Sequence, residues 1–337
     1  MLTKAHQITV TTHTRPDGDA IGSSIAAAHI INGLYGKEVG IVIANSYPDS
    51  LDFILDDSDR QHLYLNDSSD GKAAAWIDGS DLIICLDCNC FDRTESLQDS
   101  LKASKAEKIL IDHHLNPHIH DFNLCFSSEG ISSTCEMLYW VILKLPGISG
   151  DTSRIPMHSL RALMAGMTTD TNNFANSVYP STLTMASKML SAGVDRDGII
   201  SGLYNRYREN RIRMFGFALK DKMTITPEGA AYIIFSAEEL QDFDIQEGEL
   251  EGLVNIPLGI DKVRMSILLK EDSGYFRVSV RSKKGTSANI FAHKYFNGGG
   301  HELASGGRLY FPRDISSSKD AEAYVARAVK RYFKPDR

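Results

Sequence analysis

The chain has 337 residues, 42% of them hydrophobic, with 36 Lys and Arg against 43 Asp and Glu. This length exceeds a usual single core, so we expect two domains. No signal peptide and no apolar run long enough to cross a bilayer is evident, which is typical of a cytoplasmic protein with no membrane partner. Five cysteines argue against a disulfide framework and for a reducing compartment.

The charge is unevenly distributed. Residues 1–260 carry 20 Lys and Arg against 35 Asp and Glu, whereas residues 261–337 carry 16 against 8. A carboxylate-rich half suits divalent cations, and a basic half suits a phosphorylated ligand.

The first 190 residues alternate short apolar strands with helical patterns. We expect strands at 8–12, 38–44, 82–87 and 108–112, and helices at 20–35, 133–145 and 158–167. This alternation favours a parallel sheet with helices on both faces. Residues 180–222 have a polar helical pattern.

The pattern changes near residue 225. We expect strands at 232–236, 263–269, 275–281 and 308–311, helices at 288–296 and 321–332, and a hairpin turn at Asp272-Ser273-Gly274. The predicted fold class is therefore α/β. A parallel-sheet domain (1–190) is joined by a helical connector (191–224) to a smaller α/β domain with a mixed sheet (225–337).

Metal-ligand residue types follow apolar, strand-like segments at four places: His13, Asp17 and Asp19; Asp87; Asp112-His113-His114; and Asp170. Parallel strand ends gather along one crevice of an open α/β sheet, so these side chains could converge. Carboxylates with imidazole suit manganese, magnesium or iron. Alternatively, Asp17 and Asp19 only cap a helix, and the histidine pair lies on the surface.

Two adjacent histidines behind a strand rarely serve packing. Asp112 could orient one imidazole, so that one histidine binds metal and the other faces the substrate. Two metals about 4 Å apart can activate water and brace a phosphoryl oxygen, with a shared Asp as the usual bridge. Cys85, Cys88 and Cys90 cluster nearby, but no second cysteine pair completes a zinc site, so we interpret them as small residues beside a strand end.

The second half contains a glycine-rich turn, Gly298-Gly299-Gly300-His301, that could present N–H groups to phosphate. The strand predicted before it places Arg277, Ser279 and Arg281 on one face, and Arg264 could join them. Arginine forks suit phosphate. A flexible loop and an exposed basic strand remain the alternatives.

These motifs resemble those of the DHH phosphoesterase superfamily. His13-x-x-x-Asp17-x-Asp19, Asp87, Asp112-His113-His114 and Asp170 resemble its four motifs. The GGGH segment with Ala304-Ser305-Gly306 resembles the DHH-associated C-terminal domain. The resemblance covers nearly the whole chain and is strongest to the bacterial nanoRNase/pAp phosphatase subfamily.

The resemblance implies two Mn²⁺ ions, with Mg²⁺ or another divalent metal as an alternative. One would be held by His13, Asp17 and Asp87, the other by Asp19, Asp87, His113 and Asp170. His114 would act near the scissile phosphate, and Asp112 would orient it. The substrate would be short RNA or a nucleotide, and a homodimer is expected at the family level. The implied substrate-binding residues are Ser133, Arg264, Arg277, Arg281, Ser282, Gly298, Gly299, Gly300 and His301.

Two other functions remain open. Manganese-dependent inorganic pyrophosphatases share the DHH half and carry a Ser-Arg-Lys-Lys-type segment. Arg281-Ser282-Lys283-Lys284 is a permuted form of it, and the GGGH segment favours the nucleic-acid branch. A non-catalytic nucleotide-binding module would not need so complete a set of ligands.

Overall fold

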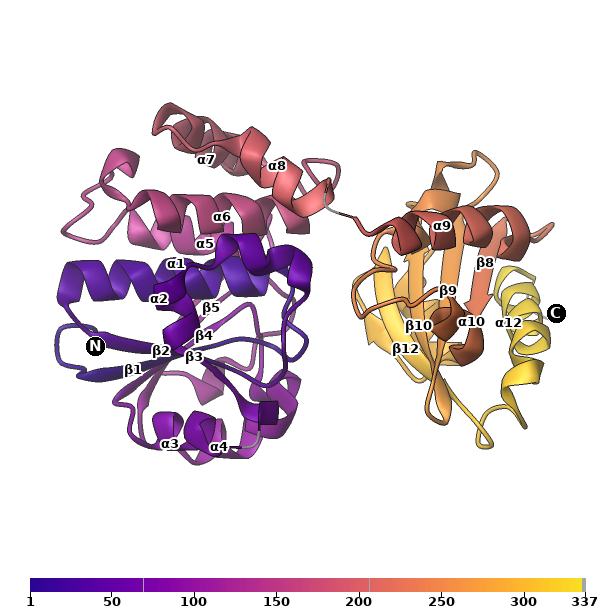
Figure 1. Cartoon of the computed structure of the whole chain (residues 1–337), viewed down its shortest axis with the longest axis horizontal. Coiled ribbons are helices and arrows are strands. Elements are labelled where there is room, and N and C mark those ends of the chain that lie inside the picture. Colours follow the sequence, from indigo (N-terminus) through magenta and orange to yellow (C-terminus); the bar gives the residue numbers. More distant parts are fainter. Residues whose placement is uncertain (69, 206, 335–337) are drawn as a thin grey trace. The chain divides into compact units, whose positions relative to one another are not determined.

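The computed structural model describes residues 1–68, 70–205 and 207–334. Its contacts divide the chain into two compact units, Met1–Arg206 (unit 1) and Tyr207–Arg337 (unit 2) (Figure 1). Within the described ranges, no helix is both long and apolar enough to cross a membrane. The separate roles predicted for 1–190, 191–224 and 225–337 stay predictions.

Unit 1 is built on a six-stranded sheet in which every neighbouring pair is parallel. In spatial order the strands are β3 (Leu63–Leu65), β2 (Glu38–Ile43), β1 (Gln7–Thr11), β4 (Leu82–Leu86), β5 (Glu107–Asp112) and β6 (Leu124–Ser127). The central strands β1 and β4 are buried along almost their whole length because helices cover both of their faces. The predicted parallel-sheet α/β fold is confirmed.

Helices cover the two faces of this sheet as separate layers (Figure 1). One face carries α1 (Gly18–Tyr35), α5 (Thr134–Ile142) and α6 (Met157–Asp170), and the other carries α3 (Lys72–Asp78) and α4 (Gln98–Ala103). The short α2 (Asp57–Gln61) follows β2. Because α1 and α6 pack against each other, the start of α1, which carries Asp19, lies close to the end of α6, which carries Asp170.

The expected strands and helices of unit 1 are present with small shifts in their ends. Asp170 ends α6, the helix expected at 158–167, and does not follow a strand as the other metal-ligand groups do. The edge strands β3 and β6 were not expected, because three or four half-buried residues give too little alternation to recognise. The short helices α2, α3 and α4 were missed for the same reason.

The predicted polar helical stretch after residue 180 consists of α7 (Pro180–Ser191), α8 (Arg196–Tyr204) and α9 (Glu209–Phe217), followed by a π-helical turn, Ala218–Lys222. Ile199 and Leu203 of α8 pack into the core of unit 1. Met214 of α9 packs into unit 2. The stretch therefore divides between the two cores.

Unit 2 contains a second six-stranded sheet. Its spatial order is β11 (Gly299–Gly300), β12 (Ala304–Tyr310), β10 (Tyr275–Ser282), β9 (Met265–Asp272), β8 (Ala230–Phe235) and β7 (Thr224–Ile225). Only the β8–β9 pair is parallel, so the sheet is mixed, as predicted. Tyr275 pairs with Asp272 across the predicted hairpin.

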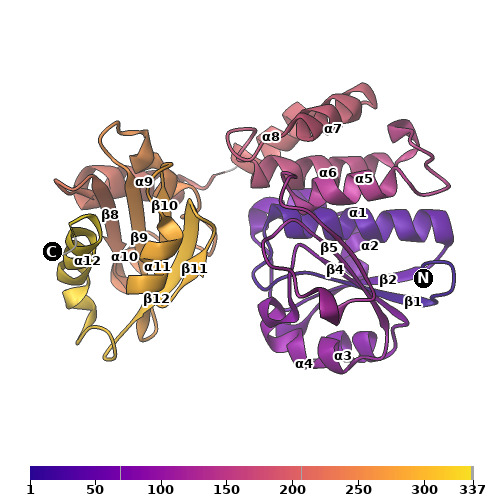
Figure 2. The same ribbon diagram turned by 180° about the vertical axis from the view of Figure 1, so that it is seen from behind.

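The two faces of the second sheet are covered by different helices (Figure 2). Helices α11 (Ala288–Tyr295) and α12 (Ala321–Phe333) pack on Phe276, Val278 and Val280. On β10, these apolar residues alternate with half-buried Arg277, Ser279 and Arg281, which therefore share the opposite face, as predicted. Helices α9 and α10 (Ala237–Asp242) complete the unit.

Candidate metal and substrate site

The candidate site lies where the sheet of unit 1 reverses its strand order. β1 and β4 are neighbours at its centre, and such a switch point is where open α/β sheets bind ligands. His13 follows β1, Asp87 follows β4 and His113 follows β5. Asp87 has φ 55°, a left-handed conformation that is rare for a residue with a side chain and frequent at functional sites.

Small residues let α1 and α6 approach closely at this edge. A β-carbon at Gly22 would lie 2.5 Å from the Ala162 carbonyl oxygen, and one at Gly166 would lie 2.3 Å from Cys135 Sγ. Gly22 lies inside α1, which begins at Gly18, and it serves the packing of the helix.

The first ligand group contains His13, Asp17 and Asp87. His13 Nε2 lies 3.3 Å from Asp87 Oδ2 and 4.0 Å from Asp17 Oδ1. Asp17 also caps α1, because its Oδ1 accepts hydrogen bonds from the backbone N–H groups of Asp19 and Ala20. Asp17 therefore both caps α1 and faces the ligand cluster, so the two interpretations considered for it are compatible.

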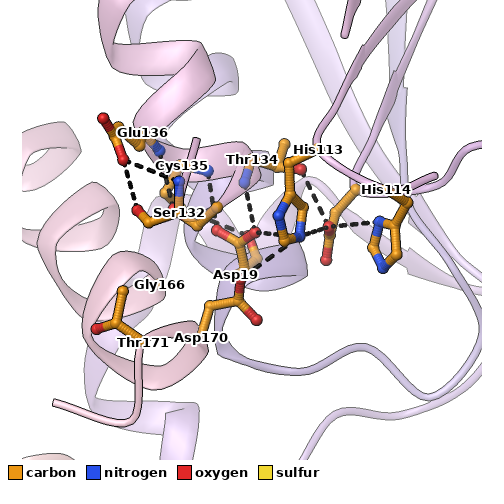
Figure 3. Close-up of polar contacts among 12 residues, drawn as sticks. Asp19, His113, His114, Ser132, Thr134, Cys135, Glu136, Gly166, Asp170 and Thr171 are labelled. Atoms are coloured by element: carbon orange, nitrogen blue, oxygen red, sulfur yellow. Dashed lines mark hydrogen bonds and ion pairs between the residues drawn. The ribbon is translucent and has the colours of Figure 1, made fainter. Parts of the chain in front are cut away.

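The second ligand group surrounds His113 (Figure 3). His113 Nε2 lies 3.4 Å from Asp170 Oδ2, 3.5 Å from Asp87 Oδ1 and 3.9 Å from Asp19 Oδ2. These distances exceed the 2.7–3.2 Å of an N–H···O hydrogen bond. They approach the separation of roughly 3.0–3.4 Å between neighbouring ligand atoms that lie about 2.1 Å from one metal ion.

The second histidine of the pair is held by the acid before it. His114 Nδ1 is 2.9 Å from Asp112 Oδ1, and the His114 backbone N–H donates to Asp112 Oδ2 at 3.0 Å. Asp112 is fully buried, so it orients the ring without meeting solvent. His114 Nδ1 is also 3.5 Å from Asp87 Oδ1, which places the imidazole at the edge of the ligand cluster.

The N-terminus of α5 holds two of the carboxylates. The backbone N–H groups of Thr134 and Cys135 donate to the two oxygens of Asp19 at 2.6 and 2.8 Å (Figure 3). Thr134 Oγ1 donates to Asp87 Oδ1 at 3.0 Å. A helix N-terminus favours negative charge. These contacts fix Asp19 and Asp87 before any ion binds.

The electrostatics of the cluster favour a cation. Burial, together with the charges of its acidic neighbours, raises the pKa of Asp19 well above its ordinary value, and that of Asp170 likewise. Burial opposes protonation of His13, but its hydrogen bond to Asp87 and the nearby acids raise its pKa to about 9. Burial lowers the pKa of His113. Protons thus partly neutralise carboxylates that divalent ions could neutralise instead.

The donor set fits hard or borderline divalent metals. The two groups share Asp87, whose two oxygens face different histidines, so this carboxylate could contribute to holding an ion in either group. Among the described residues, no group that could hold a cation contains a cysteine. Cys85 and Cys88 are buried, and their thiols donate to backbone carbonyls. They pack beside Asp87 as small buried residues.

Ser133, predicted to contact substrate, is the buried N-cap of α5, and its Oγ accepts the Glu136 backbone N–H at 3.0 Å. Glu136 is itself buried and accepts hydrogen bonds from Ser132 and Thr182. This network anchors the helix start that holds Asp19.

The predicted arginines of unit 2 differ in their partners. Arg277 donates to Asp272 at 2.9 Å and to Glu247 at 2.8 Å. Arg281 donates through Nη1 to the carbonyls of Val280 and Ser305 at 3.0 and 3.4 Å. Burial lowers the pKa of Arg281, an effect that Glu251 opposes. Of the two, Arg281 is thus the less neutralised by hydrogen-bonded acids.

Arg264 and Ser282 lie apart from this face. The Arg264 guanidinium stacks over Phe333, 4.5 Å from the ring centre, and donates to the Glu228 carbonyl. Ser282 is buried, and its Oγ donates to the Thr286 carbonyl at 2.6 Å. Lys283 donates to the Ile260 and Asp261 carbonyls. The structure does not bring Arg264 beside Arg277 and Arg281.

The glycine-rich segment is part of the sheet. Gly299 and Gly300 pair with β12, and exposed His301 follows them. A β-carbon at Gly298 would lie 1.9 Å from the Gly306 carbonyl oxygen, so close packing of the chain requires that glycine. This position therefore has a structural reason for glycine, besides the predicted phosphate contact.

Sequence reasoning missed the contacts of Thr134 and Cys135 because two of them are made by backbone N–H groups. It also missed Arg93, whose Nη1 is buried without a hydrogen-bond partner among the described residues. The charge of Arg93 acts to lower the pKa of His13, so it lies close to the first ligand group. In the sequence, the only indication of this arginine's position was that it follows Asp87 by six residues.

Known proteins share both units. The profile of the DHH family N-terminal domain matches residues 7–167, and that of the DHHA1 domain matches residues 229–327. A crystal structure of an exopolyphosphatase-related protein from Bacteroides fragilis has a TM-score of 0.89 and 33% identity, covering 98% of this chain and 94% of that one. The chain belongs to the DHH family. It carries the predicted DHH and DHHA1 domains, and the predicted resemblance is confirmed.

Curated relatives of this DHH-family chain carry related names. A Bacillus subtilis (strain 168) protein named bifunctional oligoribonuclease and PAP phosphatase NrnA is 29% identical over 303 residues, covering 88% of each chain. A probable NrnA from Streptococcus mutans is 27% identical over 304 residues, again covering 88% of each. Family membership and these relatives identify the chain as a phosphoesterase hydrolase, as predicted.

Proposed function

We propose that this DHH-family phosphoesterase uses manganese to hydrolyse short oligoribonucleotides, including linear dinucleotides such as pApA, to mononucleotides, to remove the 3′-phosphate of pAp, or to do both. The observation that carries the proposal is the convergence of seven ligand-type side chains at one switch point, with Asp87 shared between two groups. The names of the NrnA relatives support the substrate classes.

His13, Asp17 and Asp87 would hold one cation. Asp19, His113 and Asp170 would hold the other, together with Asp87, whose Oδ1 lies 3.5 Å from His113 Nε2. When bound, the two cations supply an activated water and stabilise charge on the phosphoryl oxygens. The chain itself holds two buried carboxylates in place. Thr134 and Cys135 orient Asp19, and Thr134 also orients Asp87.

His114 would exchange a proton at the reacting phosphate. Asp112 accepts the Nδ1 proton, so exchange with the leaving oxygen would run through Nε2. Arg277, Arg281 and the segment Gly298–His301 of unit 2 would bind the part of the nucleotide away from the scissile bond. Arg264 and Ser282 of unit 2, and Ser133 near the metal-ligand residues, would also contact substrate, besides the hydrogen bonds that each makes within the chain.

The test is hydrolysis by the purified full-length protein after chelation and metal add-back. We expect EDTA to abolish turnover of pAp, pApA and a labelled five-mer RNA, and Mn²⁺ to restore it better than Mg²⁺ or Zn²⁺. Full activity after exhaustive chelation would refute the metal assignment. Preferred hydrolysis of inorganic pyrophosphate would favour the pyrophosphatase alternative.

A cytoplasmic location and a homodimeric state, both expected from the sequence, are separate proposals. Cell fractionation tests the first, and light scattering of the purified protein tests the second.

A further inference from the structure

A second cluster of imidazoles and carboxylates lies outside the catalytic group. It consists of His29 of α1, Asp56 and Asp59 at the start of α2, and His158 of α6. One ligand atom from each lies within 4.8 Å of the others. We propose that this cluster is a second metal site, which binds one zinc-class transition ion and ties α1, α2 and α6 together.

The two imidazoles converge on one buried carboxylate. His29 Nε2 lies 2.8 Å from Asp59 Oδ1, and His158 Nε2 lies 2.8 Å from Asp59 Oδ2. The side chain of Asp59 is only 2% exposed, whereas those of His29 and His158 are 25% and 19% exposed. The acid thus lies in the interior while the histidines line an approach from solvent.

Asp56 supplies the fourth ligand and is already positioned. Its Oδ1 accepts hydrogen bonds from the N–H groups of Ser58 and Asp59, which directs Oδ2 toward His158 Nε2 at 3.8 Å. Asp59 returns a contact by accepting the Asp56 N–H. This capping box fixes both carboxylates relative to each other without any help from the histidines.

The contacts at 2.8 Å are hydrogen bonds, so a proton occupies the place that an ion would take. Replacing the imidazole protons by one divalent ion requires each nitrogen–oxygen distance to open to roughly 3.0–3.4 Å. Each of the two contacts, now 2.8 Å, would lengthen by roughly 0.2–0.6 Å. The rings are tilted, with their centres 4.3 Å apart. Two imidazoles with two carboxylates are a softer set than either catalytic group, which favours zinc, nickel or cobalt over manganese.

The cluster is separate from the catalytic cations. His29 follows Asp19 along α1 by about ten residues, or roughly 15 Å of helix. His158 precedes Asp170 along α6 by about twelve residues, or roughly 18 Å. An ion here would join the far ends of the two helices whose near ends carry Asp19 and Asp170. Its role would be structural, and it does not depend on the proposed phosphoesterase substrates.

The test uses zinc binding and thermal stability, not activity. Metal-free full-length protein is titrated with Zn²⁺ by calorimetry, and bound zinc is counted after dialysis. We expect the double variant His29→Gln/His158→Gln to bind one equivalent fewer than the wild type. His62→Gln, at the exposed end of the same short helix, is the matched control and should bind as the wild type does.

A milder variant keeps the test informative if the double variant does not fold. Asp56→Asn leaves both histidines and the buried acid in place. It should weaken zinc binding at this site by at least about tenfold, because even a group that only supports a ligand is worth that much. Zinc at about 100 times its Kd should raise the Tm of the wild type by roughly 5 °C or more, and that of Asp56→Asn by less. Equal zinc counts in the wild type and a folded double variant would overturn the proposal and leave a hydrogen-bonded clamp only.

Discussion

The two units treat charge in opposite ways. In unit 1, His113 faces carboxylates at 3.4–3.9 Å without a short hydrogen bond to them, and burial together with mutual repulsion raises the pKa of Asp19 and Asp170. In unit 2, Arg277 lies against Asp272 and Glu247 at 2.8–2.9 Å. The carboxylates of unit 1 lack a cation to balance their charge, whereas the positive charge of Arg277 in unit 2 is balanced by carboxylates of its own chain.

This contrast shows which residues can be changed at least structural cost. A residue whose partner is a bound ligand contributes more to activity than to folding stability. A residue that is already paired within the chain contributes more to folding stability than to activity. Arg281 is the intermediate case, because its partners are mainly carbonyls.

The largest effect is expected for Asp87→Ala. Asp87 faces both ligand groups, so its loss would leave two cations with too few ligands. We expect kcat/KM on pApA to fall by more than the roughly 10²–10³-fold that one lost transition-state hydrogen bond costs. Cys90→Ser, three residues away, is the control. An equal loss from the cysteine change, with the fold intact, would refute the ligand assignment.

Thr134→Val tests the frame around the cations. The change removes the Oγ1 hydrogen bond to Asp87 but keeps the backbone N–H that binds Asp19. We expect the apparent Mn²⁺ affinity, measured from metal-dependent activity, to fall about 10–100-fold. Thr184→Val on α7, an exposed threonine, controls for the change of side chain. An unchanged metal dependence would show that Thr134 does not support Asp87.

The fold could largely be predicted, and so could the convergence of the ligand-type residues, because apolar strands mark the carboxyl edge of the sheet. Asp170 follows the helix expected at 158–167, which packs on α1 and so brings Asp170 close to Asp19. The hydrogen bonds of Thr134 and Cys135 to Asp19 could not be foreseen, since backbone groups over a hundred residues away make them. Arg264 left the predicted arginine face because it precedes β9 and stacks on Phe333 of α12.

Arg281→Ala tests how far unit 2 contributes to substrate binding. If Arg281 binds the remote part of the nucleotide equally in the ground and transition states, KM for pApA should rise roughly tenfold with kcat little changed. Arg277→Ala should have a smaller effect, because two acids already neutralise Arg277. Some fall in kcat is tolerable for Arg281→Ala, since a binding group can also position the substrate.

A small ester, bis-p-nitrophenyl phosphate, separates the two units in this experiment. It lacks the remote nucleotide, so Arg281→Ala should hydrolyse it normally. His114→Ala should lose kcat on both substrates, by the roughly 10²–10⁴-fold typical of proton transfer. Equal damage by Arg281→Ala to the ester and to pApA would show that the two units do not divide the work.

The smallest effect concerns the metal-free protein and its pH dependence. The pKa of His13, about 9, lies above its usual 6.5, so its contact with Asp87 stabilises the fold fully below pH 6.5. That contribution is lost as the pH rises through 9. In EDTA, we expect the Tm to fall by several degrees between pH 6.5 and 9. The pKa of His29 is also raised, through its hydrogen bond to Asp59, so the comparison needs a His13→Gln variant. That variant should show a smaller fall, and an identical fall would mean that the proton on His13 does not hold the empty cluster together.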